Sequence, residues 1–333
     1  MSNKKIICQL QGGLGNQFFQ YAVAKYIQIK TSRKLIFNFN NLSKSILKKN
    51  NNDAFYIKNE KTNSFANKIN LLDLVNVSIE KTNFLIVFQY NINRVFRKLK
   101  KYFKIDLSQF FLSTSFINEP GLDSGRYMQD FVEKFLNSKN NNIFLLGYFQ
   151  SSKYFEECKD VIFKELEPPV SKKNNFLEMH KVIKSSNVVA LCFRTYFEVP
   201  GRDTSKVIDE NHMGGIAGIE YYNKSIKIIK EKIKDPVFFV FTPKQYSFLD
   251  KLDLGSNFYF INNDTGFSGT VDNLWLMSEC KYQIISFSSF YWWGAWFSEY
   301  KFGDQSIILR PFGRAGGAER EDYYQDSWIE VNY

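Results

Sequence analysis

Residues 5–17 have the sequence Lys-Ile-Ile-Cys-Gln-Leu-Gln-Gly-Gly-Leu-Gly-Asn-Gln, and this stretch decides the fold that we expect for the chain. Its apolar first half, 5–10, predicts a buried β-strand, and the glycines that follow indicate a turn. Beyond the turn, apolar side chains recur at the spacing of one helix face, at Phe18, Phe19, Ala22, Val23, Tyr26 and Ile27. A strand, a glycine turn and a helix in this order are typical of the first unit of a nucleotide-binding α/β domain.

The glycine turn has two interpretations. Glycines after a strand let backbone N–H groups approach a phosphate, and the helix that follows adds positive partial charge. However, Phe18 stands at the third glycine position of the dinucleotide-binding pattern, so a tight turn without a ligand is an equally good interpretation. The two amide side chains after the glycines can hold sugar hydroxyls without competing for a proton. The candidate residues here for binding a phosphate-bearing sugar, the donor of a transfer reaction, are Gly13, Leu14, Gly15, Asn16 and Gln17.

Strands and helices alternate along the rest of the chain. Further strands are expected at 35–39, 142–149, 188–193, 237–242 and 282–287, and helices at 220–234, 271–281 and 290–300. The best linker signal is Pro168-Pro169, which a polar run follows. We therefore predict an α/β protein of two Rossmann-like domains with parallel sheets, 1–168 and 169–333.

Length and charge narrow the class of function. The 333 residues are enough for about two domains. A composition of 44% hydrophobic and 23% charged residues excludes wholesale disorder. The net charge of +10 favours anionic partners. Most of this charge is dispersed and no nucleic-acid-binding motif is present, so we expect no nucleic-acid partner.

Cysteine spacing and hydropathy indicate a cytoplasmic protein. No apolar run approaches the ~18 residues that span a bilayer, and the first residues lack the apolar core of a signal peptide. The four cysteines stand far apart without a Cys-x-x-Cys pair, which argues against structural zinc and disulfides.

The segment from Arg94 to Lys104 predicts a basic amphipathic helix. Such a helix can lie on an anionic membrane, here the inner face of the plasma membrane. A solvated surface helix with one core-facing stripe is the alternative.

A candidate catalytic residue follows the strand predicted at 188–193. Arg194 stands where that strand should end, and ligands of such sheets bind outside the carboxyl ends of the strands. A guanidinium there can neutralise a leaving diphosphate. An arginine at a domain interface is the structural alternative. Glu198 and Asp203 are nearby carboxylates that could act as a base.

A serine pair at the start of the helix predicted at 290–300 is a further candidate binding site. Ser288 and Ser289 can donate hydroxyl and backbone hydrogen bonds to a pyrophosphate, with Phe290 beside them. An ordinary helix cap explains one serine equally well. Trp292, Trp293 and Trp296 are most simply core packing of this helix.

Two of these stretches resemble glycosyltransferase family eleven, the α-1,2-fucosyltransferases. Gly-Gly-Leu-Gly-Asn-Gln-Phe-Phe-Gln-Tyr-Ala at 12–22 is similar to the first motif of the family. Asp-Asn-Leu-Trp-Leu-Met-Ser-Glu-Cys-Lys at 272–281 and Ser-Ser-Phe-Tyr-Trp-Trp-Gly-Ala-Trp at 288–296 are similar to its C-terminal motif. The resemblance implies a GT-B fold of two facing Rossmann-like domains, with the acceptor on 1–168 and a GDP-sugar on 169–333. It also implies inverting transfer without a metal or other cofactor.

The resemblance also assigns roles to residues. Arg194 matches the first arginine of the family's His-x-Arg-Arg-Gly-Asp motif, and Asn16 matches an asparagine thought to act near the transferred sugar. It places Asp272 at the guanine or ribose, and Ser288 and Ser289 at the diphosphate. The middle motif departs from the family, since Cys192, Thr195 and Phe197 replace its His, second Arg and Asp. Glu198, or else His212, is the substitute base that we expect.

The resulting expectation is a transferase that moves L-fucose from GDP-fucose to the 2-hydroxyl of a galactose-like residue. The acceptor would be a repeat unit of a bacterial surface glycan, O-antigen or capsule, and an acceptor linked to a lipid diphosphate is one form that we consider. Three alternatives stay open: another GDP-deoxysugar as donor, a relative that binds the donor without turnover, and a basic nucleic-acid-binding protein.

Overall fold

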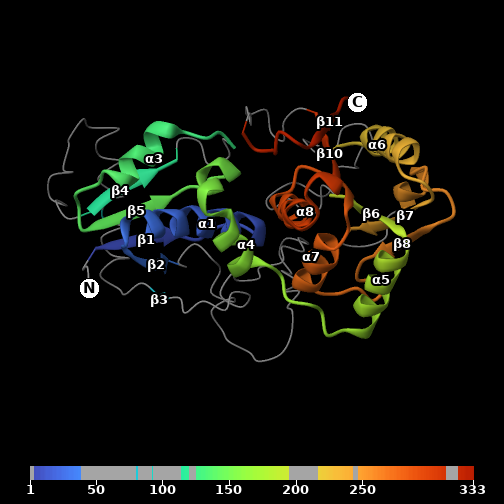
Figure 1. Cartoon of the computed structure of the whole chain (residues 1–333), viewed down its shortest axis with the longest axis horizontal. Coiled ribbons are helices and arrows are strands. Elements are labelled where there is room, and N and C mark those ends of the chain that lie inside the picture. The colour runs from blue at the N-terminus through green and yellow to red at the C-terminus, as the bar shows by residue number, and fades with distance from the viewer. Residues whose placement is uncertain are drawn as a thin grey trace. The chain divides into compact units, whose positions relative to one another are not determined.

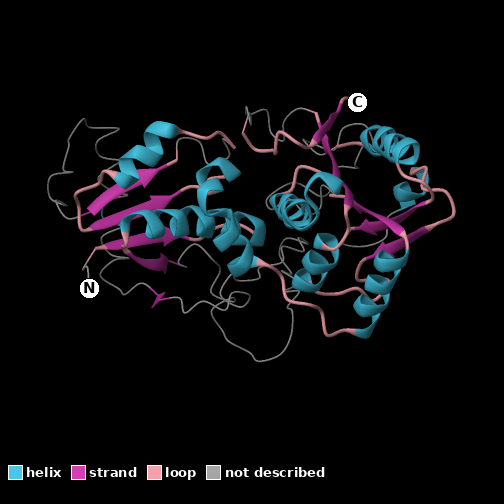
Figure 2. Ribbon diagram, viewed as in Figure 1, coloured by secondary structure: helices cyan, strands magenta, loops and turns pink. Residues whose placement is uncertain are grey.

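A computed structural model of the chain (Figures 1 and 2) describes residues 4–38, 80–81, 92, 114–119, 125–194, 217–242, 247–312 and 322–333. Its backbone contacts divide the chain into two compact units, the first extending to Glu165 and the second from Leu166 to Tyr333. The short segment Gly13–Gly15 groups with the second unit. The boundary predicted from the sequence lies after residue 168.

The first unit contains a five-stranded parallel sheet in the order β3-β2-β1-β5-β4. Its strands are β1 (Lys5–Gln9), β2 (Lys34–Asn38), β3 (Glu80–Lys81), β4 (Thr114–Asn118) and β5 (Asn142–Leu146). The helices described with it are α1 (Leu14–Thr31), α3 (Gln129–Leu136) and α4 (Lys159–Leu166), with short 3₁₀ turns at Ser152–Tyr154 and Glu156–Cys158.

Strand β1 is the centre of the first sheet. Its Ile7 pairs with Ile36 of β2 on one side and with Phe144 of β5 on the other. Successive residues of β1 are buried, as a parallel sheet covered on both faces requires. Helix α1 follows and is apolar around most of its circumference, so it is itself a buried element.

The second unit contains a six-stranded parallel sheet in the order β11-β10-β9-β6-β7-β8. Its strands are β6 (Asn187–Cys192), β7 (Pro236–Phe241), β8 (Phe258–Ile261), β9 (Tyr282–Ile284), β10 (Ile307–Pro311) and β11 (Ile329–Val331). Its helices are α5 (Asn174–Ser185), α6 (Ile219–Lys232), α7 (Thr270–Ser278) and α8 (Ser289–Phe302), with 3₁₀ turns at Ser247–Lys251 and Gly303–Gln305. If β6 is taken as strand 1 and the later strands are numbered along the chain, the order read from β8 is 3-2-1-4-5-6, which is the strand order of a Rossmann fold.

Helices cover both faces of the second sheet. Side chains of α6, such as Ile226, share a buried cluster with Val189 and Leu191 of β6. On the opposite face, the Sγ atom of Cys192 lies 3.5 Å from the Sδ atom of Met277 in α7. Helices α7 and α8 pack against each other, and Figure 1 shows them side by side.

The aromatic residues of α8 form part of this core, as the sequence predicted. Trp292 and Trp293 have no exposed surface and Trp296 is 4% exposed. A buried indole N–H needs a hydrogen-bond acceptor, and Nε1 of Trp292 finds one 2.6 Å away in the carbonyl oxygen of Tyr323.

The α/β class and the GT-B-like architecture of two parallel-sheet Rossmann units are therefore confirmed. The expected strands are present, with ends that differ by one to three residues. The segment from Arg94 to Lys104 lies outside the described residues. Among the helices that the structure describes, none is both long and apolar enough to cross a lipid bilayer.

Candidate active site

The second sheet has a topological switch point between β6 and β9. From β6 the chain runs outward through β7 and β8, then returns to the other side of β6 as β9. Parallel α/β sheets bind ligands in the crevice at the carboxyl ends of the strands that flank such a reversal. Two segments meet there, Phe193 and Arg194 after β6 and residues 285–288 after β9.

Arg194 is anchored to the segment that enters α8. The guanidinium is half-buried, and its Nη1 donates a hydrogen bond to the carbonyl oxygen of Phe287. Its Nε is buried and has no hydrogen-bond acceptor among the described residues. The structure thus brings Arg194 together with the loop that carries Ser288. Their contact with a diphosphate stays a prediction.

Three buried tyrosines hold the backbone on both sides of the switch point. The hydroxyl of Tyr222 donates to the carbonyl of Cys192 at 3.2 Å, and that of Tyr291 to the carbonyl of Phe193 at 3.1 Å. The hydroxyl of Tyr221 donates to the carbonyl of Ile285 at 2.6 Å. Because buried carbonyls must be paired, these bonds hold both segments in place before any ligand binds.

The N-terminus of α8 is open to a hydrogen-bond acceptor. Ser288 occupies the N-cap position, yet its side chain makes no capping hydrogen bond. The first intrahelical bond runs from the Trp292 amide to the Ser288 carbonyl, so the amides of Ser289 and Phe290 precede the hydrogen-bonded part of the helix. Helix N-termini of this kind favour phosphate.

Ser286 is a residue of this edge that sequence reasoning missed. It is fully buried, and its hydroxyl has no hydrogen-bond partner within the described part of the chain. A buried polar group is normally paired. The Ser286 hydroxyl, which lies in the segment between β9 and α8 and has no hydrogen-bond partner among the described residues, is therefore a candidate ligand contact. The only sequence signal was its place in the Ser-Phe-Ser-Ser run.

We expect Ser286→Ala to weaken GDP binding by about 10- to 150-fold, because a hydrogen bond to a charged group contributes ~1.5–3 kcal/mol. Isothermal titration with GDP measures this. The melting temperature should stay unchanged, since the hydroxyl has no protein partner to lose. Ser298→Ala is the matched control: that buried hydroxyl donates to the Cys280 carbonyl at 2.7 Å, so its loss should lower stability and leave GDP affinity intact.

The glycine turn serves packing as well as a possible ligand. Gly12 has φ +77°, a conformation that favours glycine. A Cβ atom on Gly15 would lie 2.4 Å from the carbonyl carbon of Ser289, and the Gly15 carbonyl accepts a 3.0 Å hydrogen bond from Nε1 of Trp293. By contrast, Gly13 is exposed and has open space where a Cβ would stand. Of these glycines, Gly13 is the one whose backbone a phosphate could approach.

The polar residues after the glycines have different environments. The amide of Gln17 is buried and donates to the Gly12 carbonyl at 3.1 Å, so it stabilises the turn itself. Asn16 is half-buried, and its Oδ1 accepts a 2.7 Å hydrogen bond from Nε2 of Gln150. Leu14 is buried at the start of α1.

Asp272 lies in the first turn of α7 and is engaged by protein groups. Its Oδ1 accepts from the Ser171 hydroxyl at 2.6 Å, and its Oδ2 lies 2.8 Å from Nζ of Lys173. These bonds attach the segment after Pro169 to α7. A contact of Asp272 with guanine or ribose stays a prediction.

The candidate bases Glu198 and His212, with Asp203, lie outside the described residues. Cys192, which replaces the family's histidine, is fully buried, and burial raises the pKa of its thiol well above the ordinary range. It therefore stays protonated and cannot take the base's place. Within the described ranges, no group of three or more His, Cys, Asp or Glu side chains could hold a metal ion.

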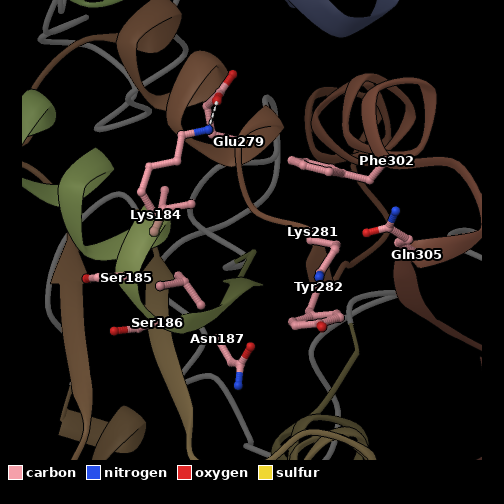
Figure 3. Close-up of a pocket in the computed structure, with 11 residues that line it drawn as sticks. Lys184, Ser185, Ser186, Asn187, Glu279, Lys281, Tyr282, Phe302 and Gln305 are labelled. Atoms are coloured by element: carbon pink, nitrogen blue, oxygen red, sulfur yellow. Dashed lines mark ion pairs between the residues drawn. The ribbon is translucent and has the colours of Figure 1, made fainter.

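A cavity of about 440 Å³ lies at the opposite edge of the second sheet. Figure 3 shows its lining, which comes from the end of α5, the starts of β6 and β9, and the region after α8. Lys184 on its wall lies 3.7 Å from Glu279. Because it lies at the amino ends of the strands, we do not take this cavity as the site of transfer.

The whole sequence was compared with known proteins. Residues 5–332 match the family described as Glycosyl transferase family 11. The chain belongs to glycosyl transferase family 11. The matched region spans both units and includes Arg194 and the segment that leads into α8. Members of this family are glycosyltransferases.

Two Escherichia coli proteins are similar over nearly their full lengths. The alpha-1,2-colitosyltransferase is 28% identical over 98% of this chain and 98% of its own. The O-antigen biosynthesis glycosyltransferase WbnK is 24% identical over 97% and 99%. Among solved structures, the fucosyltransferase NodZ from Bradyrhizobium is 12% identical with a TM-score of 0.45, covering 89% of this family 11 chain and 93% of NodZ.

Proposed function

We propose that this family 11 protein transfers L-fucose from GDP-fucose to the 2-hydroxyl of a galactose-like residue, with inversion at the anomeric carbon. The observation that carries the proposal is Arg194 at the switch point of the second sheet, bonded to the loop that enters α8. A diphosphate at this edge would meet a guanidinium, the backbone amides of Ser289 and Phe290 at the start of α8, and the Ser286 hydroxyl, which has no partner among the described residues.

The reaction is a single displacement. The acceptor oxygen attacks the anomeric carbon, the bond from that carbon to the β-phosphate oxygen breaks, and GDP leaves with the bonding electrons. The proton of the acceptor hydroxyl passes to a base, for which we propose Glu198, with His212 as the alternative. Negative charge grows on the leaving diphosphate, so Arg194 and the α8 amides act most strongly in the transition state.

A second donor is favoured by one specific observation. The relative that is 28% identical is named for colitose instead of fucose, and the middle motif of this chain lacks three of the residues expected for the family. The alternative is therefore transfer of another deoxysugar from its GDP ester by the same residues. An inactive relative that only binds the donor would show GDP-sugar binding without turnover.

We expect purified protein to release GDP from GDP-fucose when methyl β-galactoside is supplied, and to do so equally well in EDTA. The physical reason is that Arg194 and the α8 amides supply the positive charge that a metal would otherwise bring. GDP release across a panel of GDP-sugars is the measurement. Preference for a different GDP-deoxysugar would replace the fucose assignment, and loss of activity in EDTA would contradict the metal-free mechanism.

The named relatives also suggest a biological setting. One of them acts in O-antigen biosynthesis, so we propose that the acceptor is a repeat unit of a bacterial surface glycan, carried on a lipid diphosphate at the cytoplasmic face of the membrane. The basic segment from Arg94 to Lys104 would then contact anionic lipid. Co-sedimentation with vesicles of phosphatidylglycerol tests this contact, which phosphatidylcholine vesicles should not support.

A further inference from the structure

The first sheet also has a switch point, between β1 and β5. The chain leaves β1 toward β2 and β3, and later fills the other side of β1 with β5 and β4. Two amide side chains meet at the carboxyl ends of these two strands. Asn16 stands at the start of α1, and Gln150 follows the end of β5.

The two amides are joined in a defined way. Nε2 of Gln150 donates to Oδ1 of Asn16 over 2.7 Å. The Nδ2 atom of Asn16 lies against Gly12, where a Cβ atom would approach it to 2.5 Å, so the missing side chain of Gly12 makes room for this amide. Gln150 is only 5% exposed, and its Oε1 is buried without a hydrogen-bond partner among the described residues.

Two neighbouring polar side chains are hydrogen-bonded to the backbone, whereas the Gln150 oxygen, like Nε2 of Gln11, has no partner among the described residues. Gln20 donates to the Gly147 carbonyl at 3.0 Å and accepts from the Gln11 amide at 3.0 Å. The carboxylate of Glu119 is 4% exposed and accepts from the amides of Tyr148 and Phe149, at 2.8 and 2.9 Å. These bonds order the chain that leads to Gln150. A buried amide oxygen left unpaired at this ordered edge points to a ligand.

We propose that the Asn16–Gln150 pair binds the attacking hydroxyl of the acceptor sugar. This inference rests on the proposed function. The pair leaves one amide nitrogen that can donate, on Asn16, and one amide oxygen that can accept, on Gln150. If both amides were turned over, one donor and one acceptor would still remain. A sugar hydroxyl accepts one hydrogen bond and donates another, so it complements this pair.

The proposal sets a geometric requirement that follows from the chemistry of a displacement. An attacking oxygen must come within about 3–3.5 Å of the anomeric carbon, so a group that holds this hydroxyl also lies beside the transferred sugar. Neither amide can remove the proton, because both are neutral and weakly basic. Gln150 is therefore a binding residue that orients the nucleophile, and the base is a separate group.

The test uses the whole chain with Gln150→Leu, which keeps the size of the side chain and removes both polar ends. Methyl β-galactoside and its 2-deoxy analogue are the probes, and their affinities are measured by titration. We expect the wild-type protein to bind the parent sugar about 10- to 100-fold more tightly than the analogue. In Gln150→Leu this ratio should fall by about 5-fold or more, because the hydroxyl loses the oxygen that accepts from it and keeps only the Asn16 donor.

Two further measurements separate binding of the acceptor from other roles. Hydrolysis of GDP-fucose in the absence of acceptor is measured in Gln150→Leu as well, and it should fall by a smaller factor than the affinity for methyl β-galactoside, since water needs no such partner. Gln150→Glu is a second variant that keeps the shape of the side chain, in case Gln150→Leu fails to fold. A carboxylate can only accept, so the Asn16 amide must turn and donate to it. Asn16 then has no N–H to offer the sugar hydroxyl, and the parent-to-analogue ratio should fall here too. Gln20→Leu is the matched control, expected to lower the melting temperature and to keep the parent-to-analogue ratio.

The outcomes are distinct. If both Gln150 variants keep the wild-type ratio of affinities for methyl β-galactoside and its 2-deoxy analogue, the inference is overturned. It is also overturned if hydrolysis of GDP-fucose falls as much as the affinity for methyl β-galactoside, because that would place the pair at the donor sugar. If the wild-type protein neither hydrolyses nor transfers any GDP-sugar, the proposed function fails, whereas the binding ratio still reports on the amide pair.

Discussion

Replacing Arg194 with alanine is expected to lower kcat/KM for sugar transfer by about 100- to 1,000-fold, the usual effect of removing a preorganised donor from a developing negative charge. Arg194 is half-buried at the switch point and already oriented by its bond to the Phe287 carbonyl. It therefore needs little reorganisation when the diphosphate charge develops. Initial rates of GDP release at varied GDP-fucose concentration measure the loss.

Arg194→Lys separates charge from geometry. Lysine keeps the positive charge but lacks the planar fork that bonds two oxygens together, so its kcat/KM should lie between those of the wild type and Arg194→Ala. Both variants lose or alter the bond to Phe287, so the melting temperature must be recorded beside the rates. If activity falls only in proportion to the loss of folded protein, or if kcat/KM is unchanged in Arg194→Ala, the role of Arg194 is purely structural.

The second large effect is expected from the glycine turn, where two alanine substitutions should differ in their effect on thermal stability. A Cβ atom on Gly15 would lie 2.4 and 2.5 Å from backbone atoms of Ser289 and Phe290. Backbone cannot move aside as cheaply as a side-chain end, and overpacking typically costs ~1–3 kcal/mol. Gly15→Ala should therefore lower the melting temperature by about 2–10 °C and disturb the start of α8 together with phosphate binding.

Gly13→Ala is the matched partner. No atom lies within 4 Å of the position that its Cβ would take, and its φ is not positive. Thermal unfolding should therefore match the wild type. If a phosphate approaches the backbone of Gly13, the added methyl group should still weaken GDP binding by about 10-fold or more. Unchanged affinity would show that the turn serves packing alone, and a destabilised Gly13→Ala would contradict the open space seen at this position.

Much of the fold could be predicted from local patterns. The apolar stretch 5–10 became β1, and the helical spacing from Phe18 onward became α1. Strands at 188–193 and 237–242 were found within one residue of β6 and β7. These segments are buried on both faces, and this leaves continuous apolar runs in the sequence. The edge strands β8 and β11, strand β10 beside β11, and the half-exposed helix α5 leave weaker patterns, and they were not predicted.

The site was predicted only where a residue's role follows from its place in an element. Arg194 and Ser288 could be named because one ends a strand and the other begins a helix, and α/β sheets put ligands at these points. Ser286 and Gln150 were missed, because their significance lies in a hydrogen bond that is not made. No sequence pattern records an unpaired atom.

By itself, the sequence determined the α/β class, the strand–glycine–helix opening, the aromatic core of α8 and the family, since these depend on residue type and spacing along the chain. Only the tertiary structure decided that Gly15 serves close packing while Gly13 is open, that Asp272 bonds to Ser171 and Lys173, and that Asn16 meets Gln150. Hydrogen bonding and steric contact depend on distances between residues that are as much as 278 positions apart in the chain, and the tertiary fold sets these distances.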